Sequence, residues 1–190
     1  IMATQAPHES DGRVVYAGTC RPSATPPFEN PAEGERRGAT RLYVPDREIV
    51  FDDRVYGRQS VNLAHHCGDF VLQRADGAWA YQLAVVVDDA LMGVTEVTRG
   101  CDLLLSSAQQ IYLYGLLGYE TPEFAHIPLV VNAEGRRLSK RDASLSMATL
   151  REKYSAEAII GRAAALLGLL PEATPVSAAE LAGEFAWEKI

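Results

Sequence analysis

The chain has 190 residues, enough for one domain or for one domain and part of another. Apolar residues make up 47% of it, as in a globular protein with a buried core, and the net charge of −7 at pH 7 disfavours indiscriminate nucleic-acid binding through overall charge. We expect no membrane anchor and no secretion, because no apolar run approaches bilayer length and no basic and then apolar leader opens the chain. The three widely spaced cysteines favour a reducing, cytoplasmic location over a disulfide framework.

The N-terminal third predicts loops and short strands. Residues 22–38 are rich in proline, glycine and charge, which is typical of a loop or an insertion. Residues 44–51 predict an interrupted strand, and residues 52–57 a turn into another short strand. Residues 69–74 alternate polar and apolar side chains, as a half-buried strand does, and the Asp-Gly pair in residues 75–77 predicts a turn.

Three further strands are predicted in the middle of the chain. Residues 81–87 are mostly apolar and stop abruptly at Asp88 and Asp89, so we expect a sheet strand covered on both faces. Residues 94–99 form a short run rich in β-branched side chains. Residues 127–131 predict a buried strand that runs into the turn before a basic loop.

Four helices are predicted from their capping signals. A Ser-x-x-Gln capping box predicts a helix from Ser106 to Leu117, with Gly118 just past its end. Ser146 and Ser155 each have the position of an N-cap, and Ser177 and Glu180 form another capping box. The helix that follows Ser155 is predicted to bury one apolar stripe. The residues of that stripe are Ile159, Ile160, Ala163, Leu166 and Leu167.

The basic loop at residues 136–141 is the segment most suggestive of chemistry. It carries four cationic side chains and a hydroxyl directly after a predicted strand and turn. Ammonium and guanidinium groups held in advance can neutralise the developing charge of a polyphosphate. A solvated basic loop without a ligand is the alternative interpretation. The order of mixed strands, a strong helix, this loop and a helical tail favours an α/β nucleotide-binding domain followed by a helical module.

The hexamer Arg136-Arg137-Leu138-Ser139-Lys140-Arg141 resembles the second signature loop of class I aminoacyl-tRNA synthetases, in the form used by the glutamyl branch. Residues 68–72, 81–89 and 99–104 resemble, in order and spacing, the glutamyl-queuosine tRNA(Asp) synthetase family. The resemblance runs from about Tyr16 to the C-terminus, apart from the proline-rich loop. It implies an α/β fold, the second half of a class I synthetase Rossmann-type catalytic domain with a small inserted subdomain, followed by a short α-helical tail.

This resemblance implies three regions. Residues 1–60 correspond to a partial zinc subdomain and insertion. Residues 61–142 correspond to the second half of the nucleotide-binding catalytic domain with its signature loop, and residues 143–190 to a helical tail that contacts tRNA. The family's His-x-Gly-His motif is not found in the chain, and Glu96 stands where members usually carry histidine. We therefore expect an upstream segment to supply the first half of the site.

The resemblance also assigns substrate contacts. Tyr81 and Arg99 match the tyrosine and arginine that contact glutamate, and an arginine can pair a carboxylate through two hydrogen bonds. Without the resemblance, Tyr81 is read as a packing residue and Arg99 as half of a surface ion pair. Asp88 and Asp89 match an acidic pair of the family, although solvated charge at a strand end is the favoured interpretation. Lys140 matches the catalytic, ATP-contacting lysine. The implied ATP-binding residues are Arg137, Leu138, Ser139, Lys140 and Arg141.

A metal site is implied only in part. Tyr16 and Cys20 match the third and fourth zinc ligands of many members, whereas the preceding Cys-x-Cys pair is not found. A zinc site needs about four ligands, so Zn²⁺ is expected at most in the full-length protein. His8 is a possible substitute ligand, and a packed thiol at Cys20 is the alternative.

The implied activity is ATP-dependent activation of L-glutamate, with Mg²⁺, and its transfer to the queuosine base at the wobble position of tRNA(Asp). The expected RNA partner is the anticodon arm, because a flipped base in a loop suits single-strand recognition. The expected protein is monomeric. Two alternatives stay open, namely a fragment of a glutamyl-tRNA synthetase and a non-catalytic nucleotide- or RNA-binding remnant.

Overall fold

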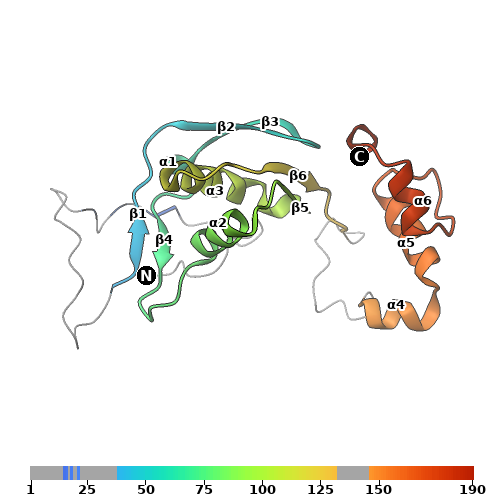
Figure 1. Ribbon diagram of the computed structural model, residues 1–190. Coiled ribbons are helices and arrows are strands. Elements are labelled where there is room, and N and C mark those ends of the chain that lie inside the picture. The colour runs from blue at the N-terminus through green and yellow to red at the C-terminus, as the bar shows by residue number, and fades with distance from the viewer. Residues whose placement is uncertain (1–14, 17, 19–20, 22–37, 132–145) are drawn as a thin grey trace. The chain divides into compact units, whose positions relative to one another are not determined.

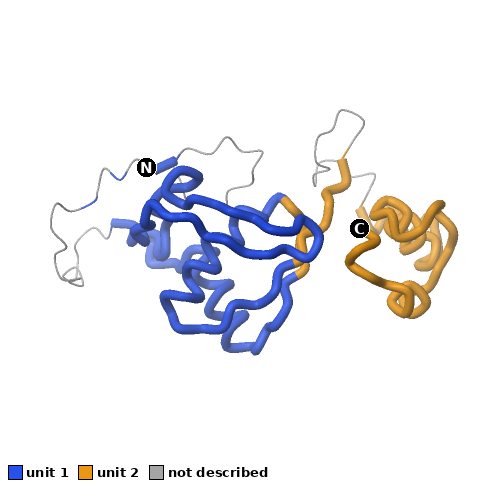
Figure 2. The backbone as a smooth tube through the Cα atoms, turned by 90° about the horizontal axis from the view of Figure 1, so that it is seen from above, with its two compact units in different colours: residues 1–97, 102–124 blue, residues 98–101, 125–190 orange. Residues whose placement is uncertain are grey.

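The computed structural model describes residues 15–16, 18, 21, 38–131 and 146–190 (Figure 1). The chain divides into two compact units, shown in Figure 2, with residues 1–97 and 102–124 in unit 1 and residues 98–101 and 125–190 in unit 2. Strands and helices alternate through the first unit, and helices follow in the second. The α/β class expected from the sequence is therefore confirmed, whereas the three functional regions stay a prediction.

A four-stranded mixed sheet forms the centre of the fold. Its strands lie in the order β3 (Gly57–Asn62), β2 (Glu48–Asp53), β6 (Glu123–Ile127) and β5 (Glu96–Gly100). β2 and β3 form an antiparallel hairpin, whereas β2 and β6 pair in parallel. A separate two-stranded sheet pairs β1 (Thr40–Leu42) antiparallel with β4 (Phe70–Gln73), so the strand expected at residues 69–74 is present. Its predicted alternation of exposed and buried side chains is wrong, because Asp69, Phe70 and Val71 are all buried.

The turn between β2 and β3 is closed by a carboxylate. Asp53 is buried, and its Oδ1 accepts hydrogen bonds from the backbone N–H of Val55 at 3.0 Å and of Tyr56 at 2.9 Å. Asp and Asn side chains often bond their own backbone two or three residues ahead in this way. The turn predicted at residues 52–57 is confirmed, although β2 begins only at Glu48, after the predicted interruption.

The strand predicted at residues 81–87 is wrong, because this segment belongs to helix α2 (Tyr81–Met92). Consecutive valines favour a strand only weakly, and tertiary packing overrides that preference. The buried positions are Gln82 and Val86, four residues apart on one helical face. Asp88 and Asp89 therefore lie within the helix, which ends at Gly93 in the left-handed conformation with a φ of 70°.

Helix α3 (Leu104–Leu117) packs against α2 and contributes to the main core. It ends at Gly118 as predicted, but the predicted capping box is wrong. The helix begins two residues before Ser106, after a 3-10 turn, and both Ser106 and Gln109 are buried within it. The core cluster around the two helices comprises Val44, Ile49, Leu63, Phe70, Val86, Ala108, Leu113 and Tyr114.

The strand predicted at residues 127–131 lies earlier in the chain, because β6 covers Glu123–Ile127. Pro128 lacks the backbone N–H that a continuing ladder needs, which accounts for the end of the strand. Val130 and Val131 are about half exposed, at 48% and 50%. Three consecutive residues within β6 are buried, so this strand is covered on both faces.

The C-terminal helices are α4 (Met147–Lys153), α5 (Ala156–Leu166) and α6 (Ala178–Gly183). All three predicted N-caps are confirmed, since Ser146, Ser155 and Ser177 each accept a hydrogen bond from a backbone N–H in the first turn. The stripe predicted for α5 is wrong in part, because Ala163 and Leu166 are exposed while Gly161 and Ala164 are buried. No helix within the described ranges is long and apolar enough to span a membrane.

Candidate substrate-binding site

The most informative contact among the predicted site residues joins the two neighbouring strands β5 and β6. Arg99 lies in β5 and is half-buried, and His126 lies in β6 with none of its surface exposed. The guanidinium Nε of Arg99 donates a hydrogen bond to Nε2 of His126 at 3.1 Å. A histidine nitrogen that accepts a hydrogen bond is unprotonated, so this geometry implies that Nδ1 carries the proton of a neutral ring. A neutral imidazole at this place restrains the Arg99 guanidinium without adding a negative charge beside it.

Tyr81 is the first residue of α2, and 43% of its surface is exposed. Ala80 precedes it in an extended conformation and supplies no side-chain cap. The phenol thus lies at the beginning of a helix, where a hydroxyl can donate to or accept from a ligand. Tyr81 belongs to unit 1 and Arg99 to unit 2, so their convergence on one amino acid stays a prediction.

The predicted ATP-binding residues lie outside the described part of the chain. That set comprises Arg137, Leu138, Ser139, Lys140 and Arg141. Their assignment to a phosphate site, with Lys140 as the catalytic residue, stays a prediction. The described chain stops at Val131 and resumes at Ser146, which caps α4.

A second cluster of charged and aromatic groups surrounds Asp69, a carboxylate with only 4% of its surface exposed. The Arg21 guanidinium donates to both carboxylate oxygens, at 2.7 and 2.8 Å, and the backbone N–H of Val44 donates to Oδ1 at 3.0 Å. Arg41 donates to the Asp69 carbonyl at 2.8 Å. Burial raises the pKa of Asp69, but the hydrogen bonds from Arg21 and Val44 and the positive charge of Arg21 and Arg41 outweigh it and hold that pKa below its usual value.

The same cluster contains the predicted metal ligand Tyr16. Its backbone forms a parallel bridge with Gly68, and the Arg41 guanidinium lies 4.1 Å from the centre of its ring. Cys20 lies outside the described residues. Across the described residues, no group of three or more histidine, cysteine, aspartate or glutamate side chains is arranged to hold a metal ion. The zinc site therefore stays a prediction that rests on Tyr16 and Cys20.

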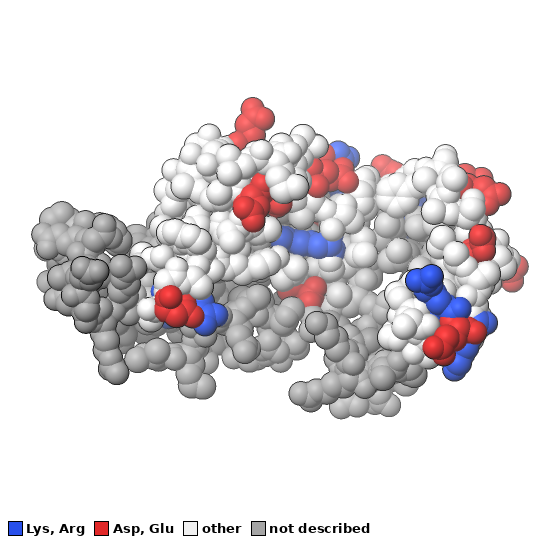
Figure 3. All heavy atoms as spheres, turned by 60° about the horizontal axis from the view of Figure 1, so that its bottom comes forward, with Lys and Arg blue, Asp and Glu red and all other residues white. Residues whose placement is uncertain are grey.

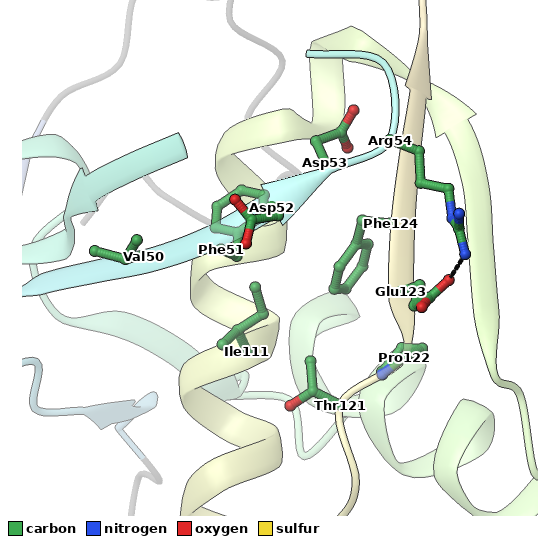
Figure 4. Close-up of a pocket in the computed structure, with 10 residues that line it drawn as sticks. All are labelled: Val50, Phe51, Asp52, Asp53, Arg54, Ile111, Thr121, Pro122, Glu123 and Phe124. Atoms are coloured by element: carbon green, nitrogen blue, oxygen red, sulfur yellow. Dashed lines mark hydrogen bonds and ion pairs between the residues drawn. The ribbon is translucent and has the colours of Figure 1, made fainter. Parts of the chain in front are cut away.

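An open groove of about 530 Å³ lies in unit 1 beside the β2–β3 turn (Figure 4). Its apolar wall includes Phe51 and Phe124, whose rings meet edge to face with centroids 6.3 Å apart. At its rim Arg54 forms an ion pair with Glu123. Its lining includes none of the predicted site residues that the structure describes.

Two groups of polar residues were missed by sequence reasoning. The first is His126, which stands out in the sequence as a histidine among the apolar residues of a strand. The second is a buried set of glutamines between α2 and α3, in which Gln82 donates to Gln109 at 3.0 Å and accepts from Gln110 at 2.8 Å. Of these glutamines, Gln109 was interpreted instead as part of a capping box, and no role was predicted for Gln82 or Gln110.

On the face in Figure 3, the acidic and basic side chains that the structure describes are interspersed. Because the net charge is −7, any contact with nucleic acid depends on local basic groups and not on the overall charge. In the C-terminal unit such groups include Arg151 and Lys153 in the last turn of α4.

Comparison with known proteins decides the family. The family described as class I tRNA synthetases (E and Q), catalytic domain, matches residues 3–183. The chain belongs to this family. Membership of the class I synthetases confirms the resemblance seen in the signature loop and accounts for the mixed sheet with covering helices.

Curated relatives of this class I synthetase chain include the glutamyl-Q tRNA(Asp) synthetase of Verminephrobacter eiseniae, 50% identical over 143 residues that cover 73% of this chain and 47% of the relative. The protein of the same name from Nitratidesulfovibrio vulgaris is 44% identical over 171 residues, which cover 90% of this chain and 53% of the relative. The chain thus spans about half the length of these relatives.

A solved structure similar to this class I synthetase chain is the glutamate-tRNA synthetase of Elizabethkingia anophelis. It has a TM-score of 0.66 and 35% sequence identity, with coverage of 79% of this chain and 34% of that one. The likeness confirms the predicted fold as part of a class I synthetase catalytic domain.

Proposed function

We propose that the protein activates L-glutamate with ATP and transfers it to the queuosine base at the wobble position of tRNA(Asp). The observation that carries this proposal is the 44–53% identity to relatives named glutamyl-Q tRNA(Asp) synthetase, against 35% to the glutamate-tRNA synthetase structure. The anchored guanidinium of Arg99 adds a physical reason, because it offers a fixed positive charge to a substrate carboxylate.

The first step is an attack of a glutamate carboxylate oxygen on the α-phosphorus of ATP, which breaks the bond to the leaving pyrophosphate and forms glutamyl-adenylate. In the second step a queuosine hydroxyl attacks the activated carbonyl, loses its proton and displaces AMP. In this scheme Arg99 and Tyr81 orient glutamate. Lys140, with Ser139 and its basic neighbours, neutralises the charge that develops on the phosphates. Mg²⁺ accompanies ATP in this proposal, and Tyr16 and Cys20 contribute to a zinc site.

We further propose that the C-terminal helices contact the anticodon arm, and that the protein is a cytoplasmic monomer. Arg151 and Lys153 offer cations near the end of α4, and Arg162 lies 3.9 Å from the centre of the Tyr154 ring. Cations of this kind position a nucleic-acid backbone without reading its sequence.

Activation is tested by glutamate-dependent pyrophosphate exchange in the full-length protein. We expect Arg99→Ala to raise the glutamate KM at least roughly ten-fold, because a charged hydrogen bond contributes about 1.5–3 kcal/mol. We expect Lys140→Ala to lower kcat by about 100-fold, the scale of losing one group that stabilises transition-state charge. Arg58→Ala, on an exposed position of β3, is the matched control and should change neither constant. Unchanged kinetics in both site variants would remove the assignment.

The acceptor is tested with a queuosine-containing anticodon stem-loop of tRNA(Asp) that has no acceptor end. Labelled glutamate should become attached to this RNA and not to the same stem-loop with guanosine at the wobble position. Labelling of the 3′ end of tRNA(Glu) instead would favour the glutamyl-tRNA synthetase alternative. Binding of ATP without any exchange would favour a non-catalytic remnant.

A further inference from the structure

Arg99 is a flexible side chain that has to present its guanidinium in one orientation if it is to recognise glutamate. An unrestrained arginine loses substantial rotamer entropy when it binds a ligand, and this loss weakens binding. A partner that fixes the side chain beforehand removes part of this cost. One contact that does so comes from β6, next to β5 in the sheet (Figure 1).

His126 suits this task because of its burial and its chemistry. It is fully buried between Ala125 and Ile127 in a strand covered on both faces, so its ring is held by packing. Its Nε2 accepts from Arg99 Nε at 3.1 Å. A carboxylate at this place would hold the guanidinium equally well, but its negative charge would oppose the binding of a second carboxylate. A neutral imidazole restrains Arg99 without neutralising it.

The hydrogen bond also involves the appropriate nitrogen. Nε lies at the inner end of the guanidinium, whereas end-on pairing with a carboxylate uses Nη1 and Nη2. A hydrogen bond at Nε therefore restrains the orientation of the guanidinium and leaves Nη1 and Nη2 at the end that a carboxylate would approach. We propose that His126 is a positioning residue for glutamate recognition, acting through the Arg99 guanidinium. This inference rests on the proposed function, in which Arg99 binds glutamate.

The test compares His126→Leu, which removes the acceptor, with His126→Gln, whose side-chain oxygen can replace it. Each is made in the full-length protein, with and without Arg99→Ala, and the KM values for glutamate and ATP are measured separately by pyrophosphate exchange. We expect His126→Leu to raise the glutamate KM roughly ten-fold, from the contribution of one charged hydrogen bond, and to leave the ATP KM within about two-fold. His126→Gln should restore most of the affinity for glutamate.

The double variant separates positioning from general structural damage. If His126 acts through Arg99, His126→Leu should add less than about two-fold to the glutamate KM once Arg99 is alanine, because coupled residues are not additive. Additive effects, or equal changes in the two KM values, would overturn the inference. If Arg99→Ala itself leaves the glutamate KM unchanged, the proposed function of Arg99 fails instead, and the two failures are thereby distinguished.

A measurement on the unaltered protein applies even if the buried variants do not fold. Nitrogen NMR of histidine-labelled protein reports the tautomer of each of the four histidines, which are assigned by substituting the other three in turn. We expect His126 to be neutral, with its proton on Nδ1 and an unprotonated Nε2. A proton on Nε2 is incompatible with acceptance from Arg99 and would refute the contact on which the inference depends.

Discussion

Replacing Gly161 by alanine should destabilise the C-terminal unit, although alanine is the better helix former. Gly161 is a buried residue of α5. An ideal Cβ there would lie 1.8 Å from the carbonyl oxygen of Thr174 and 2.7 Å from its carbonyl carbon, and both are backbone atoms. The segment that contains Thr174 is tied to α5, because the backbone N–H of Val176 donates to the Glu157 carbonyl at 3.2 Å. The new methyl group therefore has to displace a bonded stretch of backbone.

The change in unfolding free energy for Gly161→Ala is the sum of one favourable and two unfavourable effects. Alanine is favoured over glycine by about 1 kcal/mol within a helix. Overpacking typically costs about 1–3 kcal/mol. Displacing the facing segment also weakens the hydrogen bond at Val176, which contributes about 1 kcal/mol. We therefore expect the free energy of unfolding of this unit to fall by about 1–3 kcal/mol, taking these ranges together.

The assay is urea unfolding followed by tryptophan fluorescence in a Trp79→Phe background. Trp79 is 64% exposed, and its removal leaves Trp187, which packs edge to face on Phe185 with ring centroids 4.9 Å apart. The matched control is Gly183→Ala, in α6 of the same unit, where an added Cβ meets no atom within 4 Å and where helix propensity predicts no loss of stability. An unchanged or increased stability of Gly161→Ala would refute the packing argument.

Two further substitutions test buried polar contacts. Asp69→Asn should lower the free energy of unfolding near pH 7 by about 1.5 kcal/mol, the lower end for a charged hydrogen bond because Arg21 is 42% exposed. The pKa of Asp69 is lowered on folding, so the stability that its carboxylate contributes is fully present above the unfolded-state pKa and is lost as the pH falls through the folded-state pKa. The difference in unfolding free energy between wild type and Asp69→Asn should therefore vanish in acid titrations. Gln109→Leu leaves the Gln82 amide without its acceptor at a buried site, and thermal or urea unfolding should show a loss of about 1–3 kcal/mol.

Exposed residues of the same types provide the controls. Asp76 pairs with Arg74 at the surface, so Asp76→Asn should change acid stability little. Gln59 in β3 donates to the backbone carbonyl of Tyr56 through an exposed hydrogen bond, and Gln59→Leu should stay within about 0.5 kcal/mol of wild type. Asp69→Asn would contradict the electrostatic argument if its deficit persisted unchanged at low pH. A neutral Gln109→Leu would contradict the role given to the glutamine network.

The sequence by itself determined the features that depend on neighbouring residues. The capping box at Ser177 and Glu180 was predicted and is present in full, because both partners lie within one helical turn. The glycine that ends α3 was predicted for the same reason, since the left-handed conformation of Gly118 is a local backbone requirement. The signature loop was recognised from contiguous residues, and the family match confirms the membership that it indicated.

Only the tertiary structure decided the features that depend on distant partners. The valine-rich segment that begins at Tyr81 is a helix because one of its faces packs on α3, and strand propensity is too weak to oppose that packing. The serine and glutamine read as a helix cap are buried in the middle of the resulting helix pair. Arg99 and His126 are separated by 27 positions in the chain and meet only because β5 and β6 are neighbours in the sheet. Local side-chain chemistry specifies caps and turns, whereas the pairing of strands specifies which polar groups can reach each other.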